Sequence, residues 1–213
     1  AAIIHVKSHR LPGLYDVMKN TATRDKLIDS GAELIAQQGY NATGINAVLK
    51  TCGVPKGSFY HYFESKEKFG QALIQDYVAT YMDDLESLLD DAGGTAANQL
   101  IAYFRCWQQS QTDECTSNKC LVVKLSAEIA DFSVEMREAL QHDTDRVIAR
   151  LASLIEAGID DGSIHADVPA GELAEWLYQL WLGASLLDKL RKNGAAFDNA
   201  MRLTERLIDA TKT

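Results

Sequence analysis

Apolar residues recur at helical spacing through most of the chain, and this feature constrains the fold more than any other. Leu27, Gly31, Leu34 and Ile35 follow the i, i+4, i+7, i+8 spacing of one helix face. No stretch alternates between apolar and polar residues for long enough to predict a strand. The sequence therefore predicts an all-α protein.

Glycine, proline and capping residues divide this pattern into separate helices. Gly39 ends a helix whose signal is strong from Thr23, and Thr43 is expected to cap the next helix. Gly53 breaks that second helix, and Pro55 can open a short third helix in its first turn. Further helices are predicted from Ser65 to Gly93 and over about 96–111, 118–131, 133–160, 169–192 and 196–210.

Composition and cysteine usage indicate an ordinary cytoplasmic protein. Hydrophobic residues make up 46% of the chain, yet no apolar run approaches the roughly 18 residues that a membrane span needs. The N-terminal apolar stretch is soon broken by Lys7 and Pro12, which does not match a secretory signal. The four cysteines form no CxxC pair, so we expect reduced thiols.

The charge is unevenly distributed between the two ends of the chain. The net charge is -9, but residues 1–76 carry nine basic and seven acidic residues, and the rest carries twelve basic and twenty-three acidic residues. Phosphates would repel such an acidic body. Any contact with nucleic acid must therefore be confined to the N-terminal part.

Residues 43–63 have the pattern of a helix-turn-helix: two short helices, a tight turn that contains glycine, and a second helix with one apolar face. Phe59, Tyr62 and Phe63 are expected to form that buried face. Cys52 lies on the apolar stripe of the first helix of the motif and is expected to belong to the core. The opposite face carries small, polar or hydrogen-bonding residues, namely Lys56, Gly57, Ser58, Tyr60 and His61.

The residue types on this outer face suit contact with a DNA duplex. Ser58 and His61 can reach base edges, and Gly57 lets the backbone approach closely. Lys56, Tyr60 and Lys66 suit phosphate contacts, which set the register of a protein on DNA but carry little sequence information. The alternative is a helical hairpin of some other bundle, in which these side chains would only be solvated.

The segment from Val54 to Phe63, followed by Ser65-Lys66-Glu67, resembles the signature of the TetR family of transcriptional regulators. The pair Gly39-Tyr40 and the threonine Thr43 stand at the distances of the family pattern, and the resemblance covers residues 23–70 without a gap. It places Thr43 and Gly44 with the DNA-binding residues. It also implies a homodimer that reads a palindromic operator, with half-sites roughly 34 Å or a little more apart.

The family resemblance implies three regions and a mode of action. Residues 1–17 are interpreted as an N-terminal extension or a remnant that is not native. Residues 18–66 form a three-helix DNA-binding head with the helix-turn-helix. Residues 67–213 form a larger helical body for sensing and dimerisation. A small-molecule inducer usually binds such a body and releases the DNA, and repression is the usual outcome in the family.

Cys120 is the best candidate for a sensing thiol. Ser117 or Asn118 can cap a helix that places this cysteine in its first turn, where the helix dipole favours a thiolate. Lys119 and Lys124 add positive charge. The alternative is that a free cysteine is only a small buried apolar residue. Cys115, five residues earlier, could resolve an oxidised Cys120 or be a bystander.

The stretch from Cys120 to Asp131, with Met136-Arg137, is similar to the branch of the TetR family typified by NemR and AcuR. The segment Leu180 to Ala184, with Lys189 after it, resembles the NemR pattern. The resemblance implies that the signal is a reactive electrophile, an oxidant or a small unsaturated acid, with Cys120 as the sensing thiol. A reversible, non-covalent inducer is the alternative. Lys189 would neighbour the site or extend to solvent.

Several large side chains could line an inducer cavity in the body. They are Tyr103, Trp107, Tyr178 and Trp181, with Cys106 beside them. Aromatic residues at helical spacing are more often part of a core, so packing is the competing interpretation for each.

The last two long helices carry the apolar residues that a dimer interface would need. These are Leu173, Leu177, Leu180, Leu186, Leu187 and Leu190, then Met201, Leu203, Leu207 and Ile208. The sequence cannot separate burial within a chain from burial between chains. A homodimer through these helices is therefore an implication of the resemblance.

Other functions receive little support from the sequence. A thiol enzyme would need a recognisable catalytic order, and a cofactor or metal would need a glycine-rich phosphate loop, an HExxH motif or metal-ligand spacing, none of which occurs. We therefore expect no enzyme activity, no cofactor and no metal. A protein-binding module that uses the acidic body would leave the face from Lys56 to His61 without a purpose.

Overall fold

The computed structural model describes residues 12–112, 125–126, 128–129 and 133–209. Within these ranges the regular structure is helical, with no strand and one isolated β-bridge between His165 and Asp209. The all-α prediction is confirmed. The helices are α1 (Pro12–Gln38), α2 (Ile45–Cys52), α3 (Lys56–Tyr62), α4 (Lys66–Ala92), α5 (Ala96–Thr112), α7 (Val134–Asp160), α8 (Ala170–Arg191) and α9 (Ala195–Ile208).

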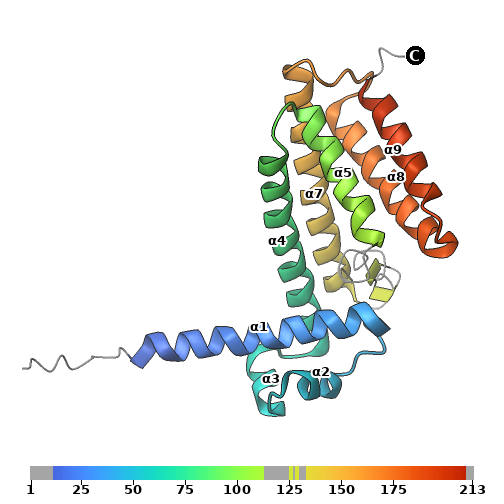
Figure 1. Ribbon diagram of the computed structural model, residues 1–213. Coiled ribbons are helices and arrows are strands. Elements are labelled where there is room, and N and C mark those ends of the chain that lie inside the picture. The colour runs from blue at the N-terminus through green and yellow to red at the C-terminus, as the bar shows by residue number, and fades with distance from the viewer. Residues whose placement is uncertain (1–11, 113–124, 127, 130–132, 210–213) are drawn as a thin grey trace, which may run out of the picture.

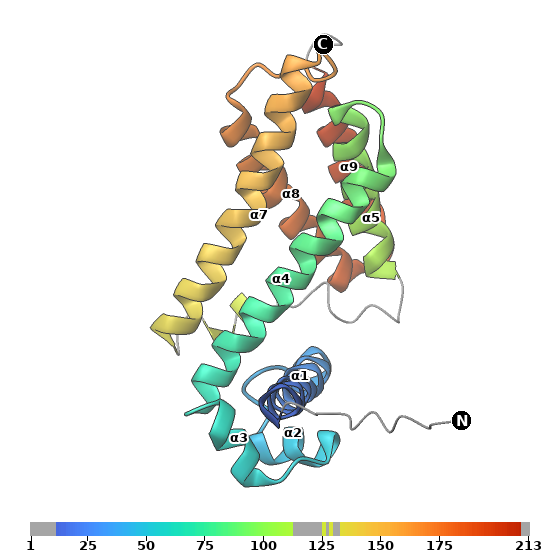
Figure 2. The same cartoon turned by 90° about the vertical axis from the view of Figure 1, so that its left-hand side faces the viewer.

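The helices form a small head and an elongated body (Figure 1). Helices α1, α2 and α3 make the head at one end, and α4 leads from the head into the body. In the body, α7 packs against α4, α5 and α8, and α9 packs against α8. The view at right angles shows α2 and α3 at the far tip of the head, away from α5, α8 and α9 (Figure 2).

The predicted ends of α2 and α4 are found at residues whose backbone or side chain stabilises a helix end. Gly53 adopts a left-handed backbone with a φ of 67° and ends α2, a conformation that glycine accepts without strain. The Ser65 side chain accepts a hydrogen bond of 3.1 Å from the backbone N–H of Lys68 and so caps α4. The bounds of α5, α7, α8 and α9 agree with those predicted to within two residues.

Two expectations about the head are wrong. The first helix starts at Pro12 and not near Thr23, so position 18 falls inside α1. Its N-terminal part extends away from the rest of the head (Figure 1). In addition, Gly44 is the N-cap of α2, and no side chain caps that helix.

Thr43 is turned inward instead of capping α2. Its side chain is buried, and its hydroxyl donates a hydrogen bond of 2.7 Å to the carbonyl oxygen of Gly39. The same hydroxyl accepts a bond of 3.2 Å from Gln38 Nε2. Thr43 therefore closes the corner between α1 and α2.

Head and body have separate apolar cores, and α4 contributes to both. Phe69 and Leu73 of α4 pack in the head core, and Leu85 and Leu89 pack in the body core. Helix α7 also reaches the head core through Met136. A movement of α4 against α7 must therefore be felt in both cores, because close-packed interiors transmit strain.

The corner between α1 and α2 should depend on glycine at position 39. Gly39 has a φ of 88°, and a Cβ there would collide with the Glu128 carboxylate. Gly39→Ala should lower the free energy of unfolding in urea by about 1–2 kcal/mol or more, the usual cost of a left-handed backbone for other residues.

Gly171→Ala is the matched control, because nothing lies within 4 Å of a Cβ at Gly171, in the first turn of α8. This change should leave stability unchanged or raise it. Equal stability of the Gly39→Ala variant and the wild-type protein would contradict the described corner.

Candidate DNA-binding face and effector cavity

Helix α3 is held against the head by one aromatic anchor. Phe59 has no solvent exposure, and its ring centroid lies 5.4 Å from that of Phe63 and 5.3 Å from that of Phe69. Pro55 precedes the helix, and its carbonyl oxygen accepts a 2.9 Å hydrogen bond from the backbone N–H of Ser58. A seven-residue helix is unstable alone, so this packing fixes its position.

The opposite face of α3 is open to solvent. Lys56, Gly57 and His61 are exposed, Tyr60 is 51% exposed, and Ser58 is half-buried. Nothing lies within 4 Å of a Cβ at Gly57, so no packing inside the head requires glycine there. The helix carries no carboxylate. Five of the predicted DNA-binding residues thus share one exposed surface, which can approach a polyanion closely.

The three remaining predicted DNA-binding residues differ in their exposure to solvent and in their contacts. Gly44 is exposed at the start of α2, whereas Thr43 is buried at the corner described above. Lys66 is partly buried, and its Nζ donates a 2.8 Å hydrogen bond to the Tyr40 carbonyl oxygen and lies 4.4 Å from the centroid of the Tyr40 ring. Lys66 therefore makes its observed contacts inside the head.

Lys66 and Tyr40 form a reciprocal clamp between the α1–α2 corner and the start of α4. The Tyr40 hydroxyl donates a 3.0 Å hydrogen bond to the carbonyl oxygen of Lys66. Burial lowers the pKa of the Lys66 ammonium, and Glu67 and Glu128 act in the opposite direction. The tyrosine is 26 residues away in sequence, which is why the motif alone suggested a solvent-facing lysine.

Glu128 joins the body to the same corner. One carboxylate oxygen of Glu128 accepts a 2.9 Å hydrogen bond from the backbone N–H of Asn41. Glu128 lies only a few residues beyond the segment that contains Cys120. Glu128 is eight residues after Cys120 in the sequence, and its hydrogen bond to Asn41 reaches the head.

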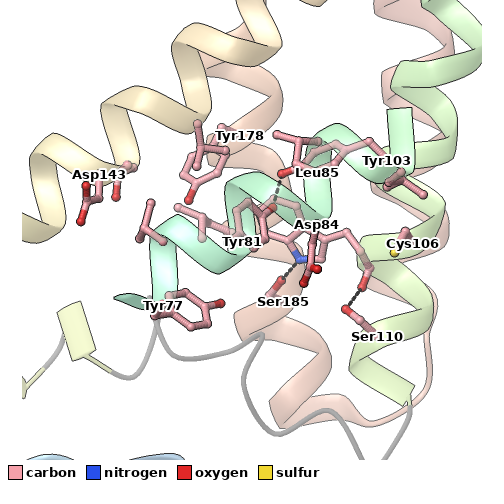
Figure 3. Close-up of a pocket in the computed structure, with 16 residues that line it drawn as sticks. Tyr77, Tyr81, Asp84, Leu85, Tyr103, Cys106, Ser110, Asp143, Tyr178 and Ser185 are labelled. Carbon is pink, nitrogen blue, oxygen red and sulfur yellow. Dashed lines mark hydrogen bonds between the residues drawn. The ribbon is translucent and has the colours of Figure 1, made fainter. Parts of the chain in front are cut away.

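The body contains a cavity of about 110 Å³ between α4, α5, α7 and α8 (Figure 3). One water needs at least roughly 10–15 Å³ of such space, so the cavity has room for several waters or one small organic molecule. Tyr103, Cys106, Trp107 and Tyr178 line it, as predicted. Other lining residues that the sequence analysis did not select are Tyr77, Tyr81, Asp84, Ser110, Asp143 and Ser185.

Two predicted sensor residues lie elsewhere in the body. Trp181 is fully buried in the core, where its ring stacks on Phe104 with centroids 4.6 Å apart and its Nε1 donates a 3.0 Å hydrogen bond to Thr204. Lys189 is exposed near the end of α8 and does not line the cavity. Lys189 is eight residues after Trp181 and four after Ser185, the last residue of α8 that lines the cavity.

The remaining sensor residues of the sequence analysis are Cys120, Lys124 and Cys115, and they lie outside the described residues. Most of the helix predicted over 118–131 also falls there, although 125–126 and 128–129 are helical. Cys52 is half-buried against the head core, as expected.

The polar groups of the cavity wall are mostly hydroxyls. The Tyr81 and Tyr103 hydroxyl oxygens are 2.5 Å apart, and Trp107 Nε1 donates a 3.0 Å hydrogen bond to the Ser185 hydroxyl. Burial raises the pKa of Tyr178 to about 12 and also raises the pKa values of Tyr81 and Tyr103. These phenols therefore stay protonated near neutral pH, and one of the Tyr81 and Tyr103 hydroxyls donates to the other.

Helices α8 and α9 expose apolar side chains. Leu186, Leu190 and Leu203 are 50%, 75% and 42% exposed. By contrast, Leu173, Leu177 and Ile208 are buried within the chain. The structure thus divides the apolar residues of the predicted interface into a part that packs internally and a part that does not.

Metal and membrane sites find no support in the described part of the chain. No group of three or more His, Cys, Asp or Glu side chains that could hold a metal occurs in those ranges. No described helix combines the length and the apolar character that crossing a bilayer requires.

The head, the tip helix α3 and the helical body together match one family. Residues 27–73 match the model for bacterial regulatory proteins of the TetR family, and residues 96–204 match the C-terminal domain of tetracycline repressor-like proteins. The chain belongs to the TetR family, which consists of transcriptional regulators and not of enzymes.

Individual relatives span nearly the whole chain. The transcriptional repressor NemR of Escherichia coli is 38% identical over 189 residues, which cover 87% of this chain and 94% of NemR. Its structure in the reduced form has a TM-score of 0.83 and 37% identity, and covers 88% of this chain and 97% of that one. A solved regulator of the TetR/AcrR family has a TM-score of 0.78 at 42% sequence identity. The match covers 89% of this chain and 100% of that one.

A second named relative is more distant. The transcriptional regulator AcuR of Cereibacter sphaeroides is 32% identical over 164 residues, which cover 77% of this chain and 75% of AcuR. The resemblance to the branch that contains NemR and AcuR, inferred from the sequence, is thereby confirmed.

Proposed function

We propose that this chain is a dimeric repressor that reads operator DNA with α3 and leaves the DNA when the body receives a chemical signal. The observation that carries the proposal is the exposed face of α3, where Lys56, Gly57, Ser58, Tyr60 and His61 lie together opposite a buried Phe59. Membership of the TetR family and the 38% identity to a named repressor, NemR, support the same function.

The residues of this face divide by the contacts they suit. The Lys56 ammonium and the Tyr60 hydroxyl suit phosphate oxygens, which fix register. Ser58 and His61 can hydrogen-bond base edges in the major groove, where each base pair presents its own pattern. Gly57 and Gly44 allow the backbone to come close. Thr43 and Lys66 are left out of this set, because both are used inside the head.

A homodimer through α8 and α9 would present two such faces. The exposed leucines of α8 and α9 supply apolar surface that would be removed from water in a dimer, which is the main driving force of association. Two heads on one two-fold axis would match half-sites about one helical turn, roughly 34 Å, or a little more apart.

The signal has two candidate entry points. The cavity between α4, α5, α7 and α8 favours reversible binding of a small molecule, because a mostly apolar cavity with a few polar groups is the usual form of a ligand site. The similarity to NemR favours a thiol sensor at Cys120. Both would act on the same contacts, since α4 packs against the head and the Glu128 contact with Asn41 follows the Cys120 segment.

The thiol chemistry at Cys120 would be a conjugate addition. The thiolate sulfur forms a bond to the β-carbon of an unsaturated carbonyl compound, the carbon–carbon π bond breaks, and the resulting enolate takes a proton from water. This step needs no oxidant. The adduct would form eight residues before Glu128 in the sequence.

Substitutions on α3 should separate positioning from sequence reading. High-affinity duplexes are first selected from a random library with the wild-type protein. Lys56→Ala should weaken binding to every duplex and lower the slope of log K against log salt by about 1. His61→Ala should cost about 1–3 kcal/mol on the selected duplex and relax the base preference at one position of each half-site.

Arg105→Ala is the control, since it removes one positive charge from an exposed position on α5 in the body. Its DNA affinity should equal that of the wild-type protein. Equal loss of affinity in all three variants would mean that only overall charge matters, and the proposed reading face would be wrong.

The dimer can be tested at the most exposed leucines. Leu186→Glu combined with Leu190→Glu should give a monomer in sedimentation velocity and a large loss of affinity for the palindromic duplex, because two desolvated carboxylates would face their symmetry mates. Val134→Glu, at a position 54% exposed at the start of α7, is the control and should remain dimeric. A dimeric double variant would contradict the proposed interface.

Cys120→Ser tests the thiol sensor. This variant should bind the selected duplex as tightly as the wild-type protein but should no longer be released by benzoquinone or acrolein. Intact-mass spectrometry on the same samples identifies adducts. Cys106→Ser, which removes the cavity thiol, is the control and should still be released. Normal release of the Cys120→Ser variant by both electrophiles would refute covalent sensing at this residue.

A further inference from the structure

The charged side chains in the described lining of the body cavity are all acidic. Its described lining contains two carboxylates, Asp84 and Asp143, and neither lysine nor arginine nor histidine. Asp84 is exposed, whereas Asp143 is only 3% exposed. In Figure 3, Tyr81 and Tyr178 lie between the two acidic residues. The cavity wall is therefore electronegative.

Asp143 is incompletely satisfied within the protein. Its Oδ1 lies 3.3 Å from His142 Nδ1 and 3.5 Å from a guanidinium nitrogen of Arg146. Its Oδ2 is buried and has no hydrogen-bond partner among the described residues. Leaving a buried charged acceptor without a partner is costly, so this oxygen can gain much from a donor supplied by a ligand.

Arg146 compensates the charge of Asp143 only from outside, and His142 is a hydrogen-bonding neighbour of the same carboxylate. Their side chains are 47% and 74% exposed, so water screens both, and neither lines the cavity. No lysine, arginine or histidine of the described cavity lining offsets the charge of Asp143.

The rest of the wall suits a cation with an apolar body. The rings of Tyr77, Tyr81, Tyr103, Trp107 and Tyr178 line the cavity. Aromatic faces attract ammonium groups within about 6 Å of the ring centroid. Leu85, Val147 and Leu182 complete an aliphatic lining against which a short hydrocarbon could pack.

We propose that this cavity binds a small organic amine in its protonated form, with the ammonium group directed to Asp143 and the apolar body among the tyrosine and aliphatic side chains. The proposal deepens the proposed function, because it rests on this cavity being the effector site. It also implies that a small carboxylate is a poor ligand here. A carboxylate would be desolvated beside two acidic residues with no described lining cation to pair with.

Three probes of nearly equal shape test the ligand class on the wild-type protein. Benzylammonium, benzyl alcohol and benzoate differ mainly in the charge of one substituent. In calorimetric titrations at neutral pH, benzylammonium should bind at least about tenfold more tightly than benzyl alcohol, which corresponds to 1.4 kcal/mol, and benzoate should bind most weakly. Benzoate binding as tight as that of benzylammonium would overturn the proposal.

The preference should depend on Asp143. Asp143→Asn keeps the shape and one oxygen acceptor but removes the charge, so the advantage of benzylammonium over benzyl alcohol should fall to less than about threefold. Asp160→Asn makes the same change at an exposed position near the end of α7 and should keep the full preference. An undiminished preference in a folded Asp143→Asn variant would contradict the assignment, and circular dichroism verifies folding.

If Asp143→Asn does not fold, Tyr178→Phe replaces it. The ring and its cation-binding face remain, and only the hydroxyl is lost, so the order of the three probes should be preserved. A reversed order would refute an aromatic and acidic cation site.

Failure of this proposal can be told apart from failure of the proposed function. Affinity for the selected duplex is measured separately, with and without benzylammonium. DNA binding together with no preference for the amine would refute only the ligand class. Amine binding that leaves DNA affinity unchanged would support the ligand class and refute the role of the cavity as the effector site.

Discussion

The burial of Phe59 is the interaction on which the rest of the structure depends. A seven-residue helix cannot maintain itself in water, so α3 exists because its one fully buried ring packs between Phe63 and Phe69. The same packing decides which way the helix faces. With Phe59 inside, Lys56, Tyr60 and His61 must lie outside. The apolar core of the head thereby orients the polar surface of α3, and Lys56, Tyr60 and His61 are not needed for that packing.

Communication between body and head rests on few contacts. Helix α4 shares its side chains between both cores, and its first residue, Lys66, is clamped to Tyr40. Glu128 accepts a hydrogen bond from the backbone N–H of the neighbouring Asn41. The cavity is walled by α4 and α7, the two helices that contribute to both cores. Occupation of the cavity can therefore bias the position of the head without any ligand reaching it.

Sequence patterns predicted the parts that local chemistry controls. Helix ends at Gly53 and Ser65, and the inward and outward faces of α3, follow from residue type and spacing alone. Thr43 was wrongly expected to cap α2, and the contact of Lys66 inside the head was not predicted, because their partners, Gly39 and Tyr40, depend on how the chain turns back on itself. The cavity was predicted only in part. Tyr103 and Tyr178 were identified as large side chains, but Asp143 has no sequence signal, since its burial results from the packing of four helices.

Hydrogen exchange measured on the protein with and without a selected duplex tests the central claim most directly. If α3 reads the DNA, amide protection should increase most in Lys56–Tyr62 and in the adjoining start of α2, and α5 and α9 should change little. Protection confined to the body, with α3 exchanging as it does in the free protein, would contradict the account.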